Sequence, residues 1–392
     1  MMRRFSWLLV ASAIAAAGCE DETSAGLPTT LEEPVGVHDV SVLFPLPEVL
    51  GQQTSMVGAE LVGKRGVLFP LEVYSELPLV DVLLSNEQSY NLLRVVSARI
   101  DPCFPGLGEA CQNQIRLVMQ PVVLDPAGDH LVANDAAVHL FYSLTREEVE
   151  ALLRHVVELR RASGIEDGSA PLSVHPALAA EGIEGRFARG FRDALLTYAG
   201  EENLVRVTFM ALEGASDEWR FGGFDIVDGA LVPLGISGLT SSDQSFVNAD
   251  RSGVSFDQAS VTPESTNADD FSLFLFPDEA TAALADERNA AFAALLRIEN
   301  PTRHSPNTVD CVTCHIAAGT RAHAEQTYAM SATGAADAFI SATGSEPAGR
   351  TAFGTHNLRA FGIFGSEPAI SQRAANETEA VVDYVNRELV GR

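Results

Sequence analysis

Basic residues are scarce in this 392-residue chain. It has 26 Lys and Arg against 53 Asp and Glu, which gives a formal net charge of −27 at pH 7. Phosphate backbones and anionic lipid head groups repel such a chain, so no nucleic acid is expected among its partners, whereas basic proteins and cations are favoured. Apolar side chains make up 46% of the residues, an ordinary share that excludes wholesale disorder. At roughly 100–200 residues per domain, the length predicts two or three domains.

The sequence also lacks the motifs of several enzyme classes. It contains no glycine-rich phosphate loop, no nucleophile elbow and no HExxH motif, and we find no internal repeat. Beyond the N-terminus, no apolar run reaches membrane-spanning length. The five cysteines and nine histidines therefore carry most of the information about chemistry.

The N-terminus has the features of an export signal. Arg3 and Arg4 precede an apolar stretch over residues 5–17, and small residues then lead to Cys19. A basic start, a short apolar middle and a small-residue exit are typical of a secretory signal, and the apolar stretch is too short to span a bilayer. The sequence AAAGC resembles the lipobox of bacterial lipoproteins, which implies that Cys19 is lipidated and becomes the first residue of the mature protein. The alternative is an ordinary signal peptide that ends near a cysteine.

This resemblance places the protein in the bacterial cell envelope, lipid-anchored and facing the periplasm or the outer surface. We predict a lipoprotein-type signal peptide over residues 1–18, then the lipidated cysteine and a flexible tether over 19–37. The tether segment is acidic, contains proline and threonine, and has no apolar periodicity. The membrane is therefore expected as a partner only through the lipid.

Cys103 and Cys111 bracket a turn-rich stretch between two predicted strands. An exported protein folds in an oxidising compartment, so we predict that these two cysteines form a disulfide. Closing so short a loop contributes about 2–3 kcal/mol in the chain-entropy description. A metal site or a catalytic thiol is the alternative, but no histidine is nearby.

The remaining cysteines form the motif Cys311-Val312-Thr313-Cys314-His315. CxxCH is the attachment signature of c-type haem. Two thiols one helical turn apart can each add to a haem vinyl group, and the adjacent imidazole then ligates the iron. A thioredoxin-like redox pair and half of a zinc site are the alternatives. The first lacks its strand-to-helix context, and the second lacks further closely spaced ligands.

Residues 275–392 resemble the monohaem c-type cytochromes around this motif. An apolar helical pattern covers residues 278–298, with Leu284 on its buried face, and the motif is expected to open a second helix. A terminal amphipathic pattern covers residues 376–390, and small cytochromes c pack such a helix near the motif helix. The resemblance implies a mainly α-helical cytochrome c-like domain with one covalent haem c, held by the two motif cysteines and by His315 as the proximal iron ligand.

The distal iron ligand departs from that family. Small cytochromes usually supply a methionine shortly before the terminal helix, but residues 361–373 contain none. We predict His304 or His356 in this role, with Met330 or an open coordination position as alternatives. His323 follows the motif histidine by eight residues on roughly the same helix face, so it is not expected to reach the opposite side of the iron.

The region before the motif predicts a β-rich domain over residues 38–235 with a helical insert at about 145–200. In the insert, Thr145 and Glu148 form a capping box ahead of an apolar stripe. His155 and His175 are predicted to face solvent, and His139 is predicted to be structural. Strands are predicted over residues 67–73, 92–100, 114–123, 138–142 and 204–212, and in a hairpin over 220–236 whose turn is Asp228-Gly229.

Residues 236–274 are polar and rich in Ser and Asp, which predicts a connector between the two domains. The fold class expected for the whole chain is α+β. Electron transfer to or from a basic redox protein is the leading functional hypothesis, because covalent haem on an exported acidic protein is suited to exchanging electrons with a diffusing partner. Two alternatives remain open. One is a haem enzyme with an open distal site, in which His356 with Arg359, or His304 with Arg303, would act on a peroxide or another small ligand. The other is a haem-bearing sensor or binding lipoprotein.

Overall fold

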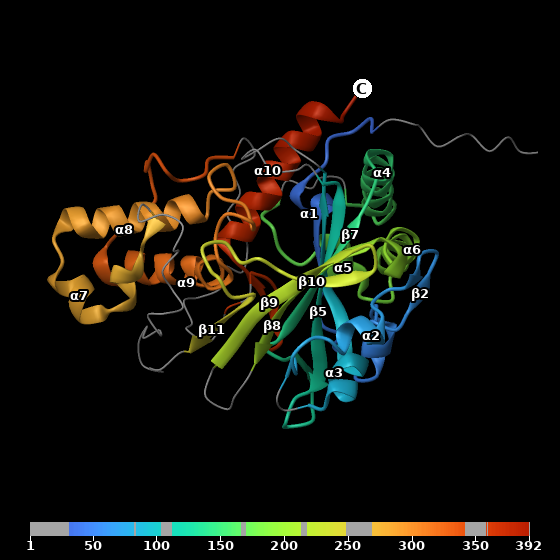
Figure 1. Cartoon of the computed structure of the whole chain (residues 1–392). Helices are drawn as coiled ribbons and strands as arrows, with labels where there is room; N and C mark the ends of the chain where they lie inside the picture. The colour runs from blue at the N-terminus through green and yellow to red at the C-terminus, as the bar shows by residue number, and fades with distance from the viewer. Residues whose placement is uncertain are drawn as a thin grey trace, which may run out of the picture.

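The computed structural model describes residues 31–81, 84–102, 112–165, 170–212, 218–247, 269–341, 358 and 360–391. The chain combines helices with one large antiparallel sheet and is therefore of the α+β class (Figure 1). No described helix is both long enough and apolar enough to cross a membrane. The predicted lipidation site Cys19, the predicted pair Cys103 and Cys111, and the candidate ligand His356 lie outside the described residues.

The sheet has nine strands. Seven of them follow the order β1-β4-β5-β7-β8-β9-β10, while β6 pairs with β5 and β11 pairs with β9. All neighbours are antiparallel. The strands are β1 (Ser41–Leu43), β4 (Leu93–Asp101), β5 (Gln114–Leu124), β6 (Leu131–Ala133), β7 (Ala137–Ser143), β8 (Leu204–Leu212), β9 (Glu218–Val227), β10 (Ala230–Pro233) and β11 (Asp243–Val247). Two small pairs lie outside it, β2 (Val62–Gly63) with β3 (Gly66–Val67) and β12 (Phe361–Phe364) with β13 (Glu367–Ile370).

Most of the predicted strands are confirmed, including the β9–β10 hairpin. Asp228 and Gly229 have φ values of 51° and 79°, the left-handed conformations that a tight two-residue turn needs. The strand predicted over 67–73 is wrong, because β3 ends at Val67 and the chain then forms helix α2 (Leu71–Tyr74). The predicted connector is also partly wrong, because β11 extends the sheet and buries Phe246.

The helical insert forms as predicted, with α4 (Arg146–Ala162), α5 (Pro176–Glu181) and α6 (Arg186–Tyr198). The Thr145 hydroxyl accepts the Glu148 N–H at 3.2 Å, and the Glu148 carboxylate accepts the Thr145 N–H at 2.9 Å, which confirms the capping box. The buried stripe of α4 is also as expected: Val149, Leu152, Leu153, Val156 and Val157.

The C-terminal part contains α7 (Pro277–Ala282), α8 (Ala285–Ile298), α9 (Cys311–Tyr328) and α10 (Gln372–Glu388). The pattern predicted as one helix over 278–298 is two helices, and Leu284 between them is 70% exposed rather than buried. The shorter helices among the described residues are α1 (Val37–Val40), α3 (Asn86–Leu92) and the 3₁₀ turns η1 (Gln52–Ser55), η2 (Glu201–Asn203) and η5 (Ser272–Leu275).

Helices cover both faces of the sheet. Helices α4 and α6 lie on one side, and α8, α9 and α10 lie on the other (Figure 1). The terminal helix buries Val381, Val382 and Val385 in the same apolar cluster as the sheet and α4. A second cluster joins α8 and α9 to side chains of β9 and β11. Neither predicted domain boundary, at residue 235 or 274, therefore separates the two clusters.

Two neighbouring buried histidines lie in α1 and at the start of α5. His38 and His175 are both fully buried, which corrects the prediction that His175 faces solvent. Their rings are 5.9 Å apart, and the ion pair between Asp39 and Arg160 lies beside them with 2.7 Å between Oδ1 and Nε. Burial and the positive charge of Arg160 lower the pKa of His38 to about 4. Burial, His38 and Arg160 lower the pKa of His175 to about 3.

We expect this pair to make the fold acid-sensitive. Between pH 6.5 and these lowered values, the unfolded chain binds protons that the folded chain does not, so the free energy of unfolding falls as the pH falls. Each histidine should account for a loss of about 2 kcal/mol between pH 7 and pH 5. His175→Asn keeps a cap for the Ala177 N–H and should remove about half of this pH dependence, as measured by urea unfolding at both pH values. An unchanged difference between the two pH values would refute the assignment.

Candidate haem-attachment site

The CxxCH motif forms the first turn of α9, as the sequence predicted. The helix begins because Asp310 caps it: its Oδ1 accepts the Thr313 N–H at 3.0 Å. Gln244 of β11 forms hydrogen bonds with two groups at the start of this helix. Its Nε2 donates to Asp310 Oδ1 at 2.8 Å, and its Oε1 accepts the Val312 N–H at 3.0 Å. Sequence reasoning missed Gln244, because it lies in a polar stretch 66 residues before Asp310.

The two motif cysteines are not in a disulfide and are half-buried. Burial, with the neighbouring Asp310 carboxylate, raises the pKa of the Cys311 thiol to about 12. Burial also raises the pKa of the Cys314 thiol to about 11. Both groups are therefore neutral thiols at pH 7, whereas a dithiol redox motif depends on a low-pKa thiolate. This electrostatic environment disfavours the thioredoxin-like alternative.

His315 is oriented by a backbone carbonyl. Its Nδ1 donates to the oxygen of Leu358 at 2.6 Å, so the ring carries its lone pair on Nε2. Histidines that ligate metals almost always donate the other ring N–H in this way, which fixes the tautomer and the direction of the ligating nitrogen. The imidazole lies 4.9 Å from the ring of Phe221 on β9, so the motif faces the sheet.

The sheet face opposite the motif has three rows of side chains, because directly paired residues of antiparallel strands point to the same side. The first row consists of Phe221, Met210 and Ala137, on β9, β8 and β7. Two residues further along each strand, the second row consists of Gly223, Thr208, His139 and Val118. The third row consists of Asp225, Arg206, Phe141, Arg116 and Arg99.

The third row ends in a buried ionic cluster beside Cys314. Arg116 and Arg99 of this row both contact Asp101 and Glu377, and Glu377 also accepts from Arg373 of the same helix at 2.6 Å. Burial raises the pKa of Glu377, but the three guanidiniums outweigh it and the pKa is lowered well below its ordinary value. The charges of Arg373, Glu377 and Arg116 also act on the pKa of Cys314, although burial is the main cause of its rise.

Arg373 also ties α10 to the loop before the motif. Its Nη1 donates to the Ile298 oxygen at 2.6 Å, and its Nη2 donates to the His304 oxygen at 2.7 Å. The polar start of α10 therefore contacts the chain between α8 and the motif, while the apolar stripe of α10 packs with the sheet cluster.

Of the candidate distal ligands, the structure describes His304 and Met330. Both ring nitrogens of His304 have protein partners, Asp269 at 2.9 Å and Thr308 at 3.2 Å, and Asp269 also binds Arg297. Met330 follows the far end of α9, about 20 Å along the axis from His315 at 1.5 Å per residue. There it lines a cavity of about 300 Å³ with Phe292 and Leu296.

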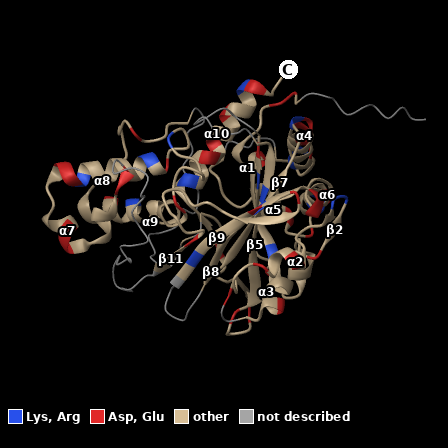
Figure 2. Ribbon diagram, in the orientation of Figure 1, with Lys and Arg blue, Asp and Glu red and all other residues tan. Residues whose placement is uncertain are grey.

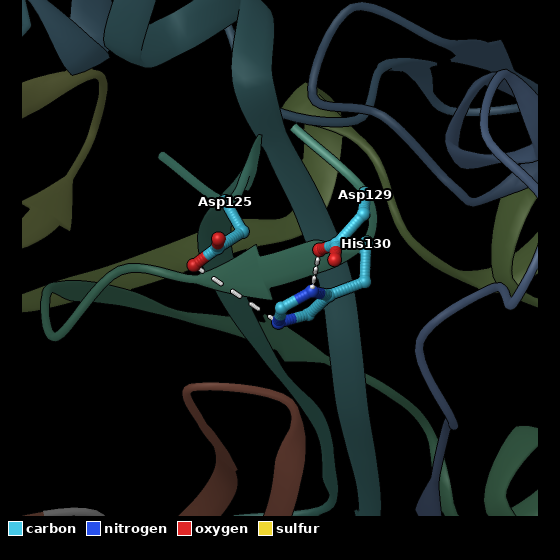
Figure 3. A group of neighbouring side chains, drawn as sticks. All are labelled: Asp125, Asp129 and His130. Atoms are coloured by element: carbon cyan, nitrogen blue, oxygen red, sulfur yellow. Dashed lines mark hydrogen bonds and ion pairs between the residues drawn. The ribbon is translucent and has the colours of Figure 1, made fainter. Parts of the chain in front are cut away.

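Among the described residues, one group of histidine and carboxylates is close enough to hold a metal ion: Asp125, Asp129 and His130 (Figure 3). It lies at the exposed turn between β5 and β6. His130 Nδ1 is 2.5 Å from Asp129, and the His130 oxygen accepts the Asp125 N–H at 2.9 Å. These interactions within the turn account for the group, and no other feature of the turn indicates a cation.

The raised pKa values of the two thiols predict that they are alkylated slowly in protein without haem. At pH 8, Cys311 and Cys314 should react with iodoacetamide at least about 100-fold more slowly in the folded chain than in urea, since so little thiolate is present. Mass spectrometry of the peptide that contains both residues measures this ratio. Comparable rates in the two states would show that the thiols are accessible and ionised, and would revive the redox-pair alternative.

The comparisons with known proteins identify no family for this chain. No protein-family model matches the chain, and neither the curated proteins nor the solved structures searched contain a match. The function is therefore inferred from the CxxCH motif and from its surroundings.

Proposed function

We propose that the chain is an exported, lipid-anchored c-type cytochrome that binds one covalent haem and exchanges electrons with a basic redox protein. The observation that carries the proposal is the hydrogen bond from His315 Nδ1 to the Leu358 oxygen at 2.6 Å. It prepares Nε2 as an iron ligand within a CxxCH motif whose two cysteines are not joined to each other. The haem would supply a one-electron change at its iron.

The surroundings of the motif support haem binding. Val138 and Leu140 of β7 are fully buried on the side of the insert, but His139 and Phe141 between and after them are only half-buried. Strand β7 lies inside the sheet, between β5 and β8. The side chains on this other face of β7 are therefore less covered than those on the side of the insert, and it is this face that an apolar group attached to α9 would cover.

Each residue of the site has a separate role in this proposal. Cys311 and Cys314 would add to the haem vinyl groups as thioethers, and His315 would hold the iron through Nε2. Gln244 and Asp310 fix the first turn of α9 against the sheet, so that these three side chains keep their spacing. Phe221 packs against the His315 ring and limits its rotation.

The surface charge supports a basic partner. Acidic residues are spread over most helices (Figure 2). The end of the molecule formed by α7 and α8 exposes Asp278, Glu279, Asp286 and Glu287. Negative charge of this kind raises the encounter rate with a basic protein at low salt, an effect that is screened as the ionic strength rises. We place the protein in the cell envelope because of its signal and lipobox, with Cys19 as the lipid site.

Expression together with the c-type haem attachment machinery tests the proposal. The purified protein should be coloured, stain for haem on a denaturing gel, and exceed the mass of the acylated polypeptide by one haem. Cys311→Ala combined with Cys314→Ala should abolish the stain, because no thioether link can form. His323→Ala, on the same helix, is the matched control and should keep it.

A colourless product would contradict the proposal, provided that a known c-type cytochrome matures in the same cells. So would a stain that survives the double cysteine variant, because the haem would then be bound elsewhere in the chain.

A further inference from the structure

We propose that Gln120 of strand β5 is a positioning residue for His315. Its side-chain amide fixes the chain that follows Leu358, and thereby the backbone carbonyl that orients the imidazole. This role rests on the proposed function, because the orientation of His315 matters here as that of an iron ligand. The observation behind it is that Gln120 forms hydrogen bonds with both backbone groups of Ile363, five residues after Leu358.

The carbonyl that accepts from His315 belongs to no helix or strand. The Leu358 side chain is 3% exposed and packs in the apolar cluster of α8 and α9, and strand β12 begins three residues later. A carbonyl outside regular structure has no helix or ladder partner to set its direction. The contacts of the backbone that follows it must therefore do so.

Strand β12 is held on the sheet by the Gln120 amide. Gln120 is fully buried; its Oε1 accepts the Ile363 N–H at 2.8 Å, and its Nε2 donates to the Ile363 oxygen at 2.9 Å. One side chain thus replaces the two hydrogen bonds that a neighbouring strand would supply. The same Nε2 donates to the Asn134 oxygen at 3.0 Å, which limits rotation of the amide. A Cβ at Gly362 would lie 2.5 Å from Oε1, so the backbone of β12 lies directly against the amide.

Two further hydrogen bonds fix the chain just after Leu358. Ser97 of β4 is also fully buried, and its Oγ donates to the Phe361 oxygen at 2.9 Å. At the start of α10, the Ser371 N–H donates to the Ala360 oxygen at 2.8 Å. The backbone of this segment is therefore bound to β4, β5 and α10, and few torsions remain that could turn the carbonyl away from the motif.

The two sheet residues lie on the face that the motif covers. Ser97 is paired with Val118 of the second row, and Gln120 follows Val118 by two residues on β5, so both side chains point to this face. His315 contacts the same face through Phe221. The imidazole and the segment that orients it are thus both packed on one surface of the sheet.

Fixing this carbonyl selects the tautomer of His315. A neutral imidazole carries its proton on either nitrogen, and the Leu358 oxygen holds it on Nδ1, which leaves the Nε2 lone pair for a metal. When the segment loses its anchors, the carbonyl can turn away and the form with Nε2–H becomes populated. The same hydrogen bond makes the imidazole a stronger electron donor, which stabilises ferric iron and lowers the reduction potential.

The tautomer is measured by selective ¹⁵N labelling of histidine in the full chain, made without haem, at pH 8, where ordinary imidazoles are neutral. The His315 signals are those absent from His315→Ala, and in the wild type they should show a protonated Nδ1. Gln120→Met keeps the size of the side chain but removes its hydrogen bonds to Ile363 and Asn134. The ratio of the Nδ1–H form to the Nε2–H form should then fall at least about threefold, as expected for the loss of one hydrogen bond.

Ser97→Ala removes only the hydrogen bond to Phe361. It should shift the ratio in the same direction by a smaller factor, and it decides the question alone if Gln120→Met does not fold. Tyr142→Phe is the matched control. It also removes one buried hydrogen bond from a sheet side chain to a backbone oxygen, that of Leu68 at 2.7 Å, and it should leave the His315 signals unchanged.

In the haem-loaded chain, Gln120→Met should keep the haem stain but raise the reduction potential, because the imidazole donates less to ferric iron. The inference is overturned if wild-type His315 carries its proton on Nε2, if the folded Gln120 and Ser97 variants both keep the wild-type ratio, or if Tyr142→Phe shifts it as much. A wild-type chain that takes up no haem would instead overturn the proposed function, and the tautomer measurement, made without haem, separates the two failures.

Discussion

The site depends on how the first turn of α9 packs against the sheet. A single amide, Gln244, donates to the capping carboxylate Asp310 and accepts the Val312 N–H. All three residues are buried, so a lost partner would leave a polar group in an apolar surrounding, at a cost of about 1–3 kcal/mol. The direction of the motif side chains is thereby tied to strand β11, and through β9 to the whole sheet.

The ionic cluster does the same for the terminal helix. Glu377 of α10 accepts from Arg99 of β4, and Arg116 of β5 lies 3.7 Å from it. Buried charges of this kind add little net stability when they are paired, but removing one partner is expensive, since the other charge remains buried. The ionic cluster therefore specifies the position of α10 on the sheet. The apolar stripe of α10 supplies the burial that stabilises this contact.

Local signals explain the parts of the fold that the sequence predicted. The Thr145 capping box and the Asp228-Gly229 turn each depend on a few neighbouring residues, and their geometry is set by backbone sterics and nearby hydrogen bonds. The errors arise where a partner distant in sequence decides the burial. His175 carries a polar ring, yet Phe187 stacks on it at 3.8 Å and the insert closes over it. Leu284 is apolar, yet it sits exposed at the junction of α7 and α8.

The sequence by itself determined the α+β class, the helix that opens at Cys311 and the three residues of the CxxCH motif, because this spacing suggests a chemistry without any tertiary context. Only the tertiary structure decided what surrounds that motif. Gln244, Phe221 and Leu358 are separated from His315 by between 43 and 94 residues along the chain, as 358−315 and 315−221 give. No local pattern marks them, because their proximity follows from strand pairing and helix packing across the sheet.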